Sequence, residues 1–312
     1  MLRFALLRLL WFIPTVLAMT AITFAIMQVT PGSPFDTGQA QGITPEMIAQ
    51  LEKLYGLDKP VHERFALYVW NSLQGDFGMS YSYRPQQVRD IIERTFPISL
   101  ALGTMATLFA VVVGMSLGIL AAVNQNGVLD YICTTISILF YSMPNFVMGG
   151  ILILFLVVWL PEQGIDVGLR PAGWDSPRDW IMPVIALGAA PLATLARFTR
   201  SSMIDVIRSD YVRTARAKGL AERKVILKHV LKNALIPVVT LIGPIFAAVA
   251  TGSFFVENIF NVPGMGRFYV ESMQSKDQTM ILAVTLVYGV FLAAMSLIVD
   301  IIYSVIDPRI RF

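Results

Sequence analysis

The sequence predicts an all-α polytopic membrane protein with six transmembrane helices. Of its 312 residues, 55% are hydrophobic and only 14% are charged, whereas soluble domains carry about 25% charged residues. Crossing a bilayer takes about 20 predominantly apolar residues. The predicted spans are Leu9–Val29, Phe96–Val123, Tyr131–Leu160, Trp180–Ala196, Asn233–Phe255 and Met280–Ile306.

The first apolar stretch follows Arg3 and Arg8, as the apolar region of a secretory signal peptide follows basic residues. It is about twice as long as such a region, so we expect a retained transmembrane helix.

Lys and Arg residues predict the orientation of the spans. Placing the N-terminus inside gives the inner segments 14 Lys/Arg in 57 residues and the outer segments 10 in 109. Inner loops of membrane proteins carry this excess, so both termini are predicted to be cytoplasmic. The inner segments are 1–8, 124–130, 197–232 and 307–312, and the outer ones are 30–95, 161–179 and 256–279.

Ionisable residues are nearly absent from the predicted spans. Asp300 is the exception, and we expect it to act as a structural hydrogen-bond acceptor. His62 and His229 both lie outside the spans, which argues against a proton relay. Cys133 is the only cysteine, so neither an intrachain disulfide nor a cysteine metal site is expected. The net charge of +3 is too small to favour nucleic acid.

The outer segment 30–95 is predicted to form a small helical subdomain between the first helix (1–29) and the core (96–312). Thr44 followed by Pro45 marks a helix start, and Gly56 marks its end. Two further helices are expected, at about Pro60–Leu73 and Pro85–Arg94. The subdomain could be a cap that packs over the bundle or a docking surface for a soluble partner.

The inner segment 197–232 holds ten Lys/Arg in 36 residues. Ser209 is predicted to cap a short helix, Asp210–Lys218, that ends at Gly219. A second helix is predicted to begin at Ala221 and to run into the fifth span, with Val225 and Val230 on one face. The basic residues could serve only to fix topology and bind anionic lipid, or the short helix could dock a cytoplasmic partner.

Several motifs carry a resemblance to a known family. The segment Arg213–Leu220 reads RTARAKGL and departs from the general Glu-Ala-Ala-x-x-x-Gly pattern in its first two residues. Other matching motifs are TPGSPF (30–35), LYGLDKP (54–60), GDFGMSY (75–81), SMPNFV (142–147), TGSFFVENIFNVPGMG (251–266) and VDIIYSVIDPRIR (299–311). Together they resemble the membrane permease subunits of ATP-binding-cassette importers in the peptide and nickel branch, and most closely the first (B-type) subunit of oligopeptide and dipeptide transporters.

The resemblance implies one half of a peptide pathway in a bacterial cytoplasmic (inner) membrane. The other half would be a homologous second permease subunit, and one or two ATPase subunits would bind ATP-Mg. A soluble binding protein would deliver the peptide. The chain itself would need no cofactor and catalyse nothing, and it has no G-x-x-x-x-G-K-[ST] loop for nucleotide phosphates. Nickel, glutathione or another peptide-like solute remains an alternative, as do a stand-alone channel or carrier and an intramembrane enzyme.

The resemblance also assigns the short inner helix to ATPase coupling. The coupling residues would be Tyr211, Arg213, Thr214, Ala215, Arg216, Ala217, Lys218, Gly219 and Leu220. Residues near the Pro144 bend and near the outer end of the fifth span are candidates for the pathway or gate, although ordinary packing would also explain them. These candidates are Met143, Pro144, Asn145, Met148, Ser253, Asn258 and Asn261.

Overall fold

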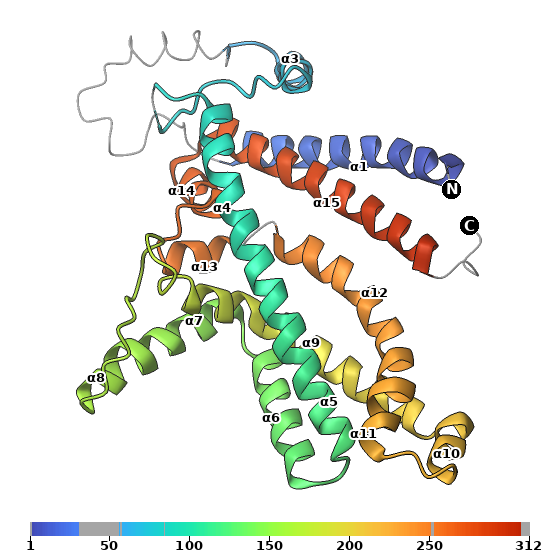
Figure 1. Ribbon diagram of the computed structural model, residues 1–312. Helices are drawn as coiled ribbons and strands as arrows, with labels where there is room; N and C mark the ends of the chain where they lie inside the picture. The colour runs from blue at the N-terminus through green and yellow to red at the C-terminus, as the bar shows by residue number, and fades with distance from the viewer. Residues whose placement is uncertain (1, 31–55, 57, 84, 251–252, 307–312) are drawn as a thin grey trace. The chain divides into compact units, whose positions relative to one another are not determined.

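The computed structural model describes residues 2–30, 56, 58–83, 85–250 and 253–306 (Figure 1). Within these residues the fold is all-α, with a single isolated β-bridge between Met79 and Gln87. Six of the described helical segments are long and apolar enough to cross a membrane. The predicted fold class and the number of spans are therefore confirmed.

One compact unit combines residues 1–98 with 264–297. It contains α1 (Leu2–Val29), α3 (Val61–Leu73), the first half of α4 (Val88–Phe109), α14 (Met265–Ser275) and most of α15 (Gln278–Ile306). Figure 1 shows α1 and α15 side by side, and Gly289 of α15 lies directly against Met19 of α1. A glycine lets two membrane helices approach this closely because it has no side chain.

The outer segment is helical where the structure describes it. The predicted helix after Pro60 is present as α3. The predicted helix at 85–94 does not begin at Pro85; the helix begins at Val88 and continues as α4. The predicted helix after Thr44 lies outside the described residues.

The second compact unit combines residues 99–263 with the end of the chain from 298. It contains α5 (Met115–Val123), α6 (Val128–Ser142), α7 (Asn145–Ile153), α8 (Leu160–Glu162), α9 (Ile181–Ile207), α10 (Asp210–Ala217), α11 (Glu222–Lys224), α12 (Leu231–Ala250) and α13 (Phe254–Ile259). Helix α9 lies at the centre of this unit, where α5, α6, α7 and α12 all contact it. Gly114 and Gly118 allow α5 to pack backbone to backbone against α9.

Three π-helical segments join α-helices without a break. They are Ala110–Gly114 between α4 and α5, Leu154–Trp159 between α7 and α8, and Val225–Val230 between α11 and α12. Each π-turn adds a residue to the helical repeat. The sequence analysis did not predict them.

The prediction of one continuous third span over Tyr131–Leu160 is wrong. Helix α6 ends at Ser142, and α7 begins at Asn145. Met143 between them is extended, with φ −89° and ψ 126°, because the ring of Pro144 disfavours a helical conformation in the preceding residue. The candidate membrane span in this region is 145–162, and α6 is a shorter apolar helix.

The fourth and fifth spans also differ from their predicted bounds. Helix α9 does not stop at Ala196 but continues to Ile207, so Arg197 and Arg200 belong to the helix. The fifth span begins earlier than predicted, at Glu222, and ends at Ala250. The last span begins at Gln278, close to the predicted Met280.

Candidate functional site

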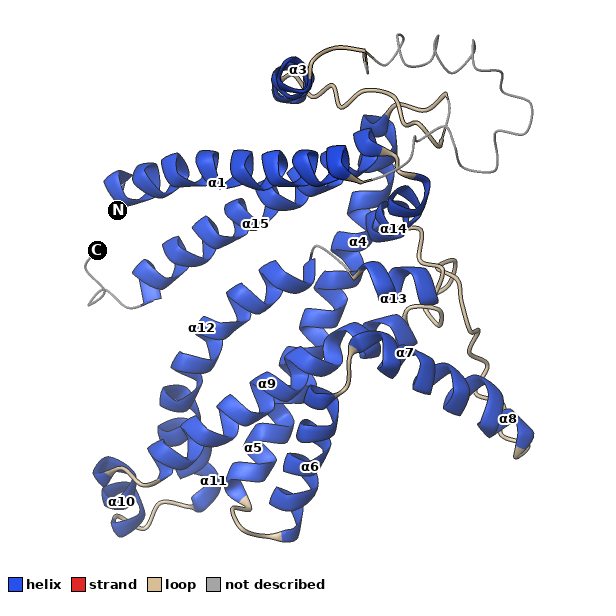
Figure 2. Cartoon of the chain, turned by 180° about the vertical axis from the view of Figure 1, so that it is seen from behind, coloured by secondary structure: helices blue, strands red, loops and turns tan. Residues whose placement is uncertain are grey.

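Helix α10 is the short helix predicted in the basic segment. It has eight residues and connects the end of α9 to α11 (Figure 2). Asp210 lies in its first turn and Arg216 in its last, which places each charge where the helix dipole favours it. It ends one residue earlier than predicted, at Ala217.

The two faces of α10 differ sharply. Val212 and Ala215 are 0% and 6% exposed and belong to a hydrophobic cluster with residues of α5, α9, α12 and the π-helical segment Val225–Val230. Residues three apart share a helix face, so this pair anchors α10 from one side. The other face is open to solvent and consists of Tyr211, Arg213, Thr214, Arg216, Ala217 and Lys218.

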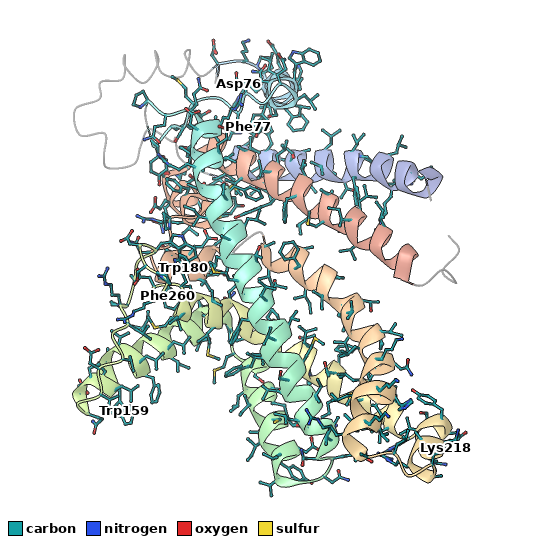
Figure 3. All side chains as sticks on the ribbon, viewed as in Figure 1. Asp76, Phe77, Trp159, Trp180, Lys218 and Phe260 are labelled. Atoms are coloured by element: carbon teal, nitrogen blue, oxygen red, sulfur yellow. The ribbon has the colours of Figure 1, made fainter. Side chains whose placement is uncertain are left out.

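The predicted coupling residues therefore divide into two groups. The exposed residues and Gly219 are available to a partner, and Lys218 lies at the end of α10 (Figure 3). Ala215 is buried and Leu220 is half-buried, and both pack in or against the hydrophobic cluster. Their contribution is to hold the helix in place.

The predicted cap by the Ser209 side chain is wrong. Ser209 occupies the N-cap position with an extended backbone, but its side chain makes no capping hydrogen bond. Its hydroxyl instead donates to the Val206 carbonyl at 2.6 Å. That carbonyl belongs to the end of α9, where backbone acceptors have no intrahelical donor, so the hydroxyl serves α9.

The predicted stop at Gly219 is confirmed. Gly219 has a φ of +76°, in the left-handed region that residues with a Cβ atom rarely adopt. Its N–H donates to the Arg216 carbonyl at 2.9 Å, and the Leu220 N–H donates to the Ala215 carbonyl at 3.4 Å. These two bonds form a Schellman motif. The motif satisfies the last carbonyls of α10 and turns the chain towards α11.

Side chains fasten α10 to the segment that follows it. Arg216 makes two hydrogen bonds to the Glu222 carboxylate, at 2.7 and 3.1 Å, across the Gly219 turn. This pairing raises the pKa of the Arg216 guanidinium. At the other end, Asn233 donates to the Tyr211 hydroxyl at 2.8 Å. The helix is tied to both α11 and α12.

Some of the predicted pathway residues contact one another in the structure. Asn145 donates to the Ser253 hydroxyl at 3.1 Å, which joins the start of α7 to the start of α13. Ser253 also caps α13 by accepting a hydrogen bond from the Val256 N–H. Met148 is 5% exposed, and its neighbour Gly149 packs against the ring of Phe260, which Figure 3 labels.

The other candidates differ in exposure. Met143 is half-buried, whereas Pro144, Asn258 and Asn261 are exposed. Asn261 has a φ of +52°, which fits a turn residue as well as a gate. The role of all seven residues in a pathway stays a prediction.

An ion pair that the sequence analysis did not predict joins two helices. Arg200 of α9 donates to the two carboxylate oxygens of Asp130 at 2.6 and 2.7 Å. Asp130 also accepts from the Asn126 N–H, which orders the turn between α5 and α6. The partners are 70 residues apart in sequence, so no local spacing reveals them.

Asp277 is a second unpredicted residue, in the other unit. Its carboxylate accepts hydrogen bonds from the Ser80 hydroxyl, the Ser82 N–H, the Thr279 hydroxyl and the Met280 N–H. Asp277 is fully buried. It caps the start of α15 and fixes the 80–82 segment against it.

One sequence pattern that is typical of catalytic serines is present, but its residues have structural roles in this fold. Residues 114–118 read GMSLG and match G-x-S-x-G, a pattern that marks a nucleophile when a strand turns sharply into a helix. Here Ser116 lies within a helix, and its hydroxyl donates to the Val112 carbonyl at 2.6 Å. The two glycines make the close contact with α9. The pattern therefore gives no support to an enzyme.

Comparison with known proteins identifies the class. Residues 114–312 match the family described as the binding-protein-dependent transport system inner membrane component, and residues 1–103 match its N-terminal family. The chain belongs to this family of permease subunits of ATP-binding-cassette importers, and it is a multi-pass inner membrane protein.

Full-length relatives confirm the resemblance to B-type permeases. The chain is 41% identical to the dipeptide transport system permease protein DppB of Bacillus subtilis, over 95% of this chain and 94% of that protein. It is also 41% identical to the oligopeptide transport system permease protein OppB of Haemophilus influenzae, and 38% identical to OppB of Escherichia coli K12. Both of these matches cover all of each chain.

Two solved structures share the fold. One is an amino acid ABC transporter, with a TM-score of 0.52 and 14% identity over 68% of this chain and 92% of that one. The other is the MetNI methionine ABC transporter, with a TM-score of 0.51 and 18% identity over 70% of this chain and 96% of that one.

Proposed function

We propose that this chain forms one half of the translocation pathway of an ATP-driven, binding-protein-dependent importer of oligopeptides or dipeptides. A homologous second permease subunit supplies the other half. One or two kinds of ATPase subunit bind ATP-Mg on the cytoplasmic side, and a soluble binding protein delivers the peptide from outside. Both termini of the chain are cytoplasmic. Full-length similarity to peptide permeases supports the substrate class.

The geometry of α10 is the observation that carries this proposal. A helix anchored by Val212 and Ala215 presents an open polar face between two long membrane helices. The Schellman turn and the Arg216–Glu222 pair connect it rigidly to the fifth span. A force applied to the exposed face is therefore passed to α9 and α12, which suits a subunit moved by a partner motor.

The residues near the Pro144 break are proposed to line or gate the pathway. The Asn145–Ser253 hydrogen bond links the α6–α7 break to the start of α13. Side-chain amides, hydroxyls and thioethers contact peptides of varied sequence without selecting one side chain. This arrangement favours broad specificity.

Reconstitution tests the proposal. The chain is purified alone and with the second permease and ATPases encoded beside its gene, and both preparations are placed in vesicles with the binding protein. We expect uptake of a radiolabelled oligopeptide only by the complete complex and only with ATP. Ion-gradient-driven uptake by the isolated chain would contradict the proposal and favour a stand-alone carrier.

Competition separates the substrate classes. An excess of unlabelled peptide should abolish uptake, whereas nickel or glutathione at the same concentration should leave it unchanged. Uptake of radiolabelled nickel or glutathione, with no uptake of the labelled oligopeptide, would assign the importer to that solute and overturn the peptide assignment.

A further inference from the structure

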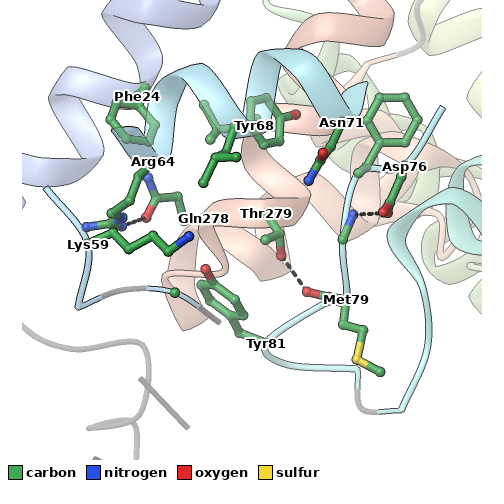
Figure 4. A pocket seen from close by; sticks show the side chains of 15 residues that line it. Phe24, Lys59, Arg64, Tyr68, Asn71, Asp76, Met79, Tyr81, Gln278 and Thr279 are labelled. Atoms are coloured by element: carbon green, nitrogen blue, oxygen red, sulfur yellow. Dashed lines mark hydrogen bonds between the residues drawn. The ribbon is translucent and has the colours of Figure 1, made fainter. Parts of the chain in front are cut away.

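A pocket of about 480 Å³ lies within the first compact unit (Figure 4). Its walls come from α1, α3, the 76–81 segment and the start of α15. The apolar part of the lining includes Phe24, Leu67, Phe77 and Leu282. The polar part includes Lys59, Arg64, Tyr68, Asn71 and Gln278, together with the Asp76 carboxylate, which accepts a hydrogen bond from the Gly78 N–H at 2.9 Å.

Arg64 is held in place with its charge uncompensated by its bonding partners. Its guanidinium donates to the side-chain oxygens of Gln28 at 3.1 Å and of Gln278 at 3.0 Å. Both acceptors are neutral amides. The guanidinium also lies over the ring of Phe24, 5.8 Å from its centre. These contacts orient the cation, and among the residues that the structure describes they include no carboxylate.

Hydrogen-bond donors predominate around this cation. Lys59 adds a second positive charge, although its ammonium pairs with the exposed Glu63 at 3.5 Å. The buried hydroxyl of Tyr68 and the buried Nε2 atom of Gln278 form no hydrogen bond of normal geometry in the described part of the chain, although the Ser72 side chain lies within reach of the Tyr68 hydroxyl. Burial raises the pKa of the Tyr68 hydroxyl, so it remains a protonated donor. Buried polar groups normally have partners, and these donors suit an anionic acceptor.

The depth of the pocket identifies the source of the anion. Gln28 lies one residue before the end of the span 10–29, and Gln278 is the first residue of the span 278–301. Arg64 bonds to both and therefore lies where the apolar spans end. Phospholipid phosphates occupy this level of a bilayer, and basic side chains at the ends of spans reach them.

We infer that this pocket binds the phosphate headgroup of a membrane phospholipid, with Arg64 as the main anion ligand. Tyr68 and Gln278 donate to the remaining phosphate oxygens, and Lys59 adds positive charge at the rim. The apolar residues on α1 and α15 accommodate the start of an acyl chain. The inference rests on the membrane location and not on the transported solute.

Retention of lipid by the purified protein tests this inference. The full chain, with the subunits that copurify with it, is titrated in detergent with dioleoylphosphatidylglycerol and measured by native mass spectrometry. We expect bound phospholipid on the wild type and about fivefold weaker binding to Arg64→Gln, the loss typical of one basic residue near a membrane. Arg64→Lys should retain most of the binding.

Arg89→Gln is the matched control. Arg89 is half-exposed, pairs with Glu93 at 2.7 Å and does not line the pocket. Its loss removes the same charge, so lipid binding should be unchanged. Equal loss in Arg64→Gln and Arg89→Gln would overturn the inference, because it would show a general charge effect.

Two further probes separate the headgroup from its parts. Dioleoylglycerol has the same acyl chains without phosphate, and inorganic phosphate has no chains. We expect neither to displace the phospholipid at equal concentration. Displacement by dioleoylglycerol would show an acyl site, and displacement by inorganic phosphate would show a site for free anions. Either result would overturn a phospholipid headgroup site.

Variants with smaller changes keep the test decisive if Arg64→Gln does not fold. Tyr68→Phe and Lys59→Gln each remove one donor and should each weaken phospholipid binding. Unchanged binding in both would overturn the inference. A variant that no longer binds the soluble binding protein but still binds phospholipid would also overturn the inference. That result would mean that the pocket binds a carboxylate of the binding protein.

Discussion

Gly219 illustrates a residue whose role lies in its backbone. A Cβ added there would meet no atom within 4 Å, so a substitution faces no steric clash. The obstacle is the φ of +76°. For a β-branched residue such a conformation costs about 1–2 kcal/mol, whereas Asn tolerates it.

This difference makes a matched pair of variants informative. In Gly219→Val the Schellman turn should open, so ATP hydrolysis by the complex should continue while peptide uptake falls severalfold. Gly219→Asn should behave nearly as the wild type. Uptake and hydrolysis are measured together in vesicles, with membrane insertion checked by immunoblot. Full uptake by Gly219→Val would remove α10 from the coupling role.

Asp277 shows the opposite case, a residue whose role lies in its side chain. Its buried carboxylate accepts four hydrogen bonds, and an amide could accept only at its single oxygen. Leaving buried donors unpaired costs about 1–3 kcal/mol. Asp277→Asn should therefore lower the melting temperature of the purified chain, whereas Asp58→Asn, at an exposed position, should not. Equal melting temperatures would show that the network is dispensable.

At the scale of elements, α10 is a helix with an anchored face and a free face. The Arg213 side chain is 72% exposed and pairs with Asp210, whose side chain is 97% exposed, at 3.5 Å. Such a surface pair contributes little to stability. Its charge is therefore available to a partner.

Charge reversal on this face tests whether α10 docks an ATPase subunit or whether its basic residues only fix the membrane topology. Arg213→Glu should weaken copurification of the ATPase, because it reverses a charge on the free face. Arg223→Glu reverses a charge on α11 in the same basic segment and should have little effect. Copurification is measured by pull-down from detergent extracts. An equal loss in both variants would mean that only the basic character of the segment matters.

Local signals explain which elements could be predicted. The stop of α10 was predictable because Gly219 acts on its own neighbours, and the six apolar spans were readable from composition. The break at Pro144 was visible as a proline, but the apolar run continues across it and conceals the two helices. The Asp130–Arg200 pair and the Asp277 network join distant segments, so no window of sequence contains them.

At the scale of the whole molecule, the orientation in the membrane connects these parts. The inner and outer segments were distinguished by Lys and Arg content alone. The structure adds that α3 carries Trp70, 64% exposed, and that α10 ends beside the exposed Lys218. These two positions should lie on opposite sides of the membrane.

The single cysteine makes this orientation measurable. Cys133 is 6% exposed, and Cys133→Ala provides a background without thiols. In spheroplasts, a membrane-impermeant maleimide should label Trp70→Cys directly, and Lys218→Cys only after permeabilisation. The reverse pattern would place α10 outside the cell and contradict ATPase coupling.

The π-helical segment Val225–Val230 has a consequence for the span that follows it. Val225 and Val230 are both fully buried, although residues five apart lie about 140° from each other on an ordinary α-helix. The wider repeat brings them towards one side. It also sets the rotational phase of α12. If the same six residues adopted the ordinary α-helical repeat, the following helix would be rotated by about 100°. The contacts of α12 with α9 thus depend on one extra residue close to the Gly219 turn.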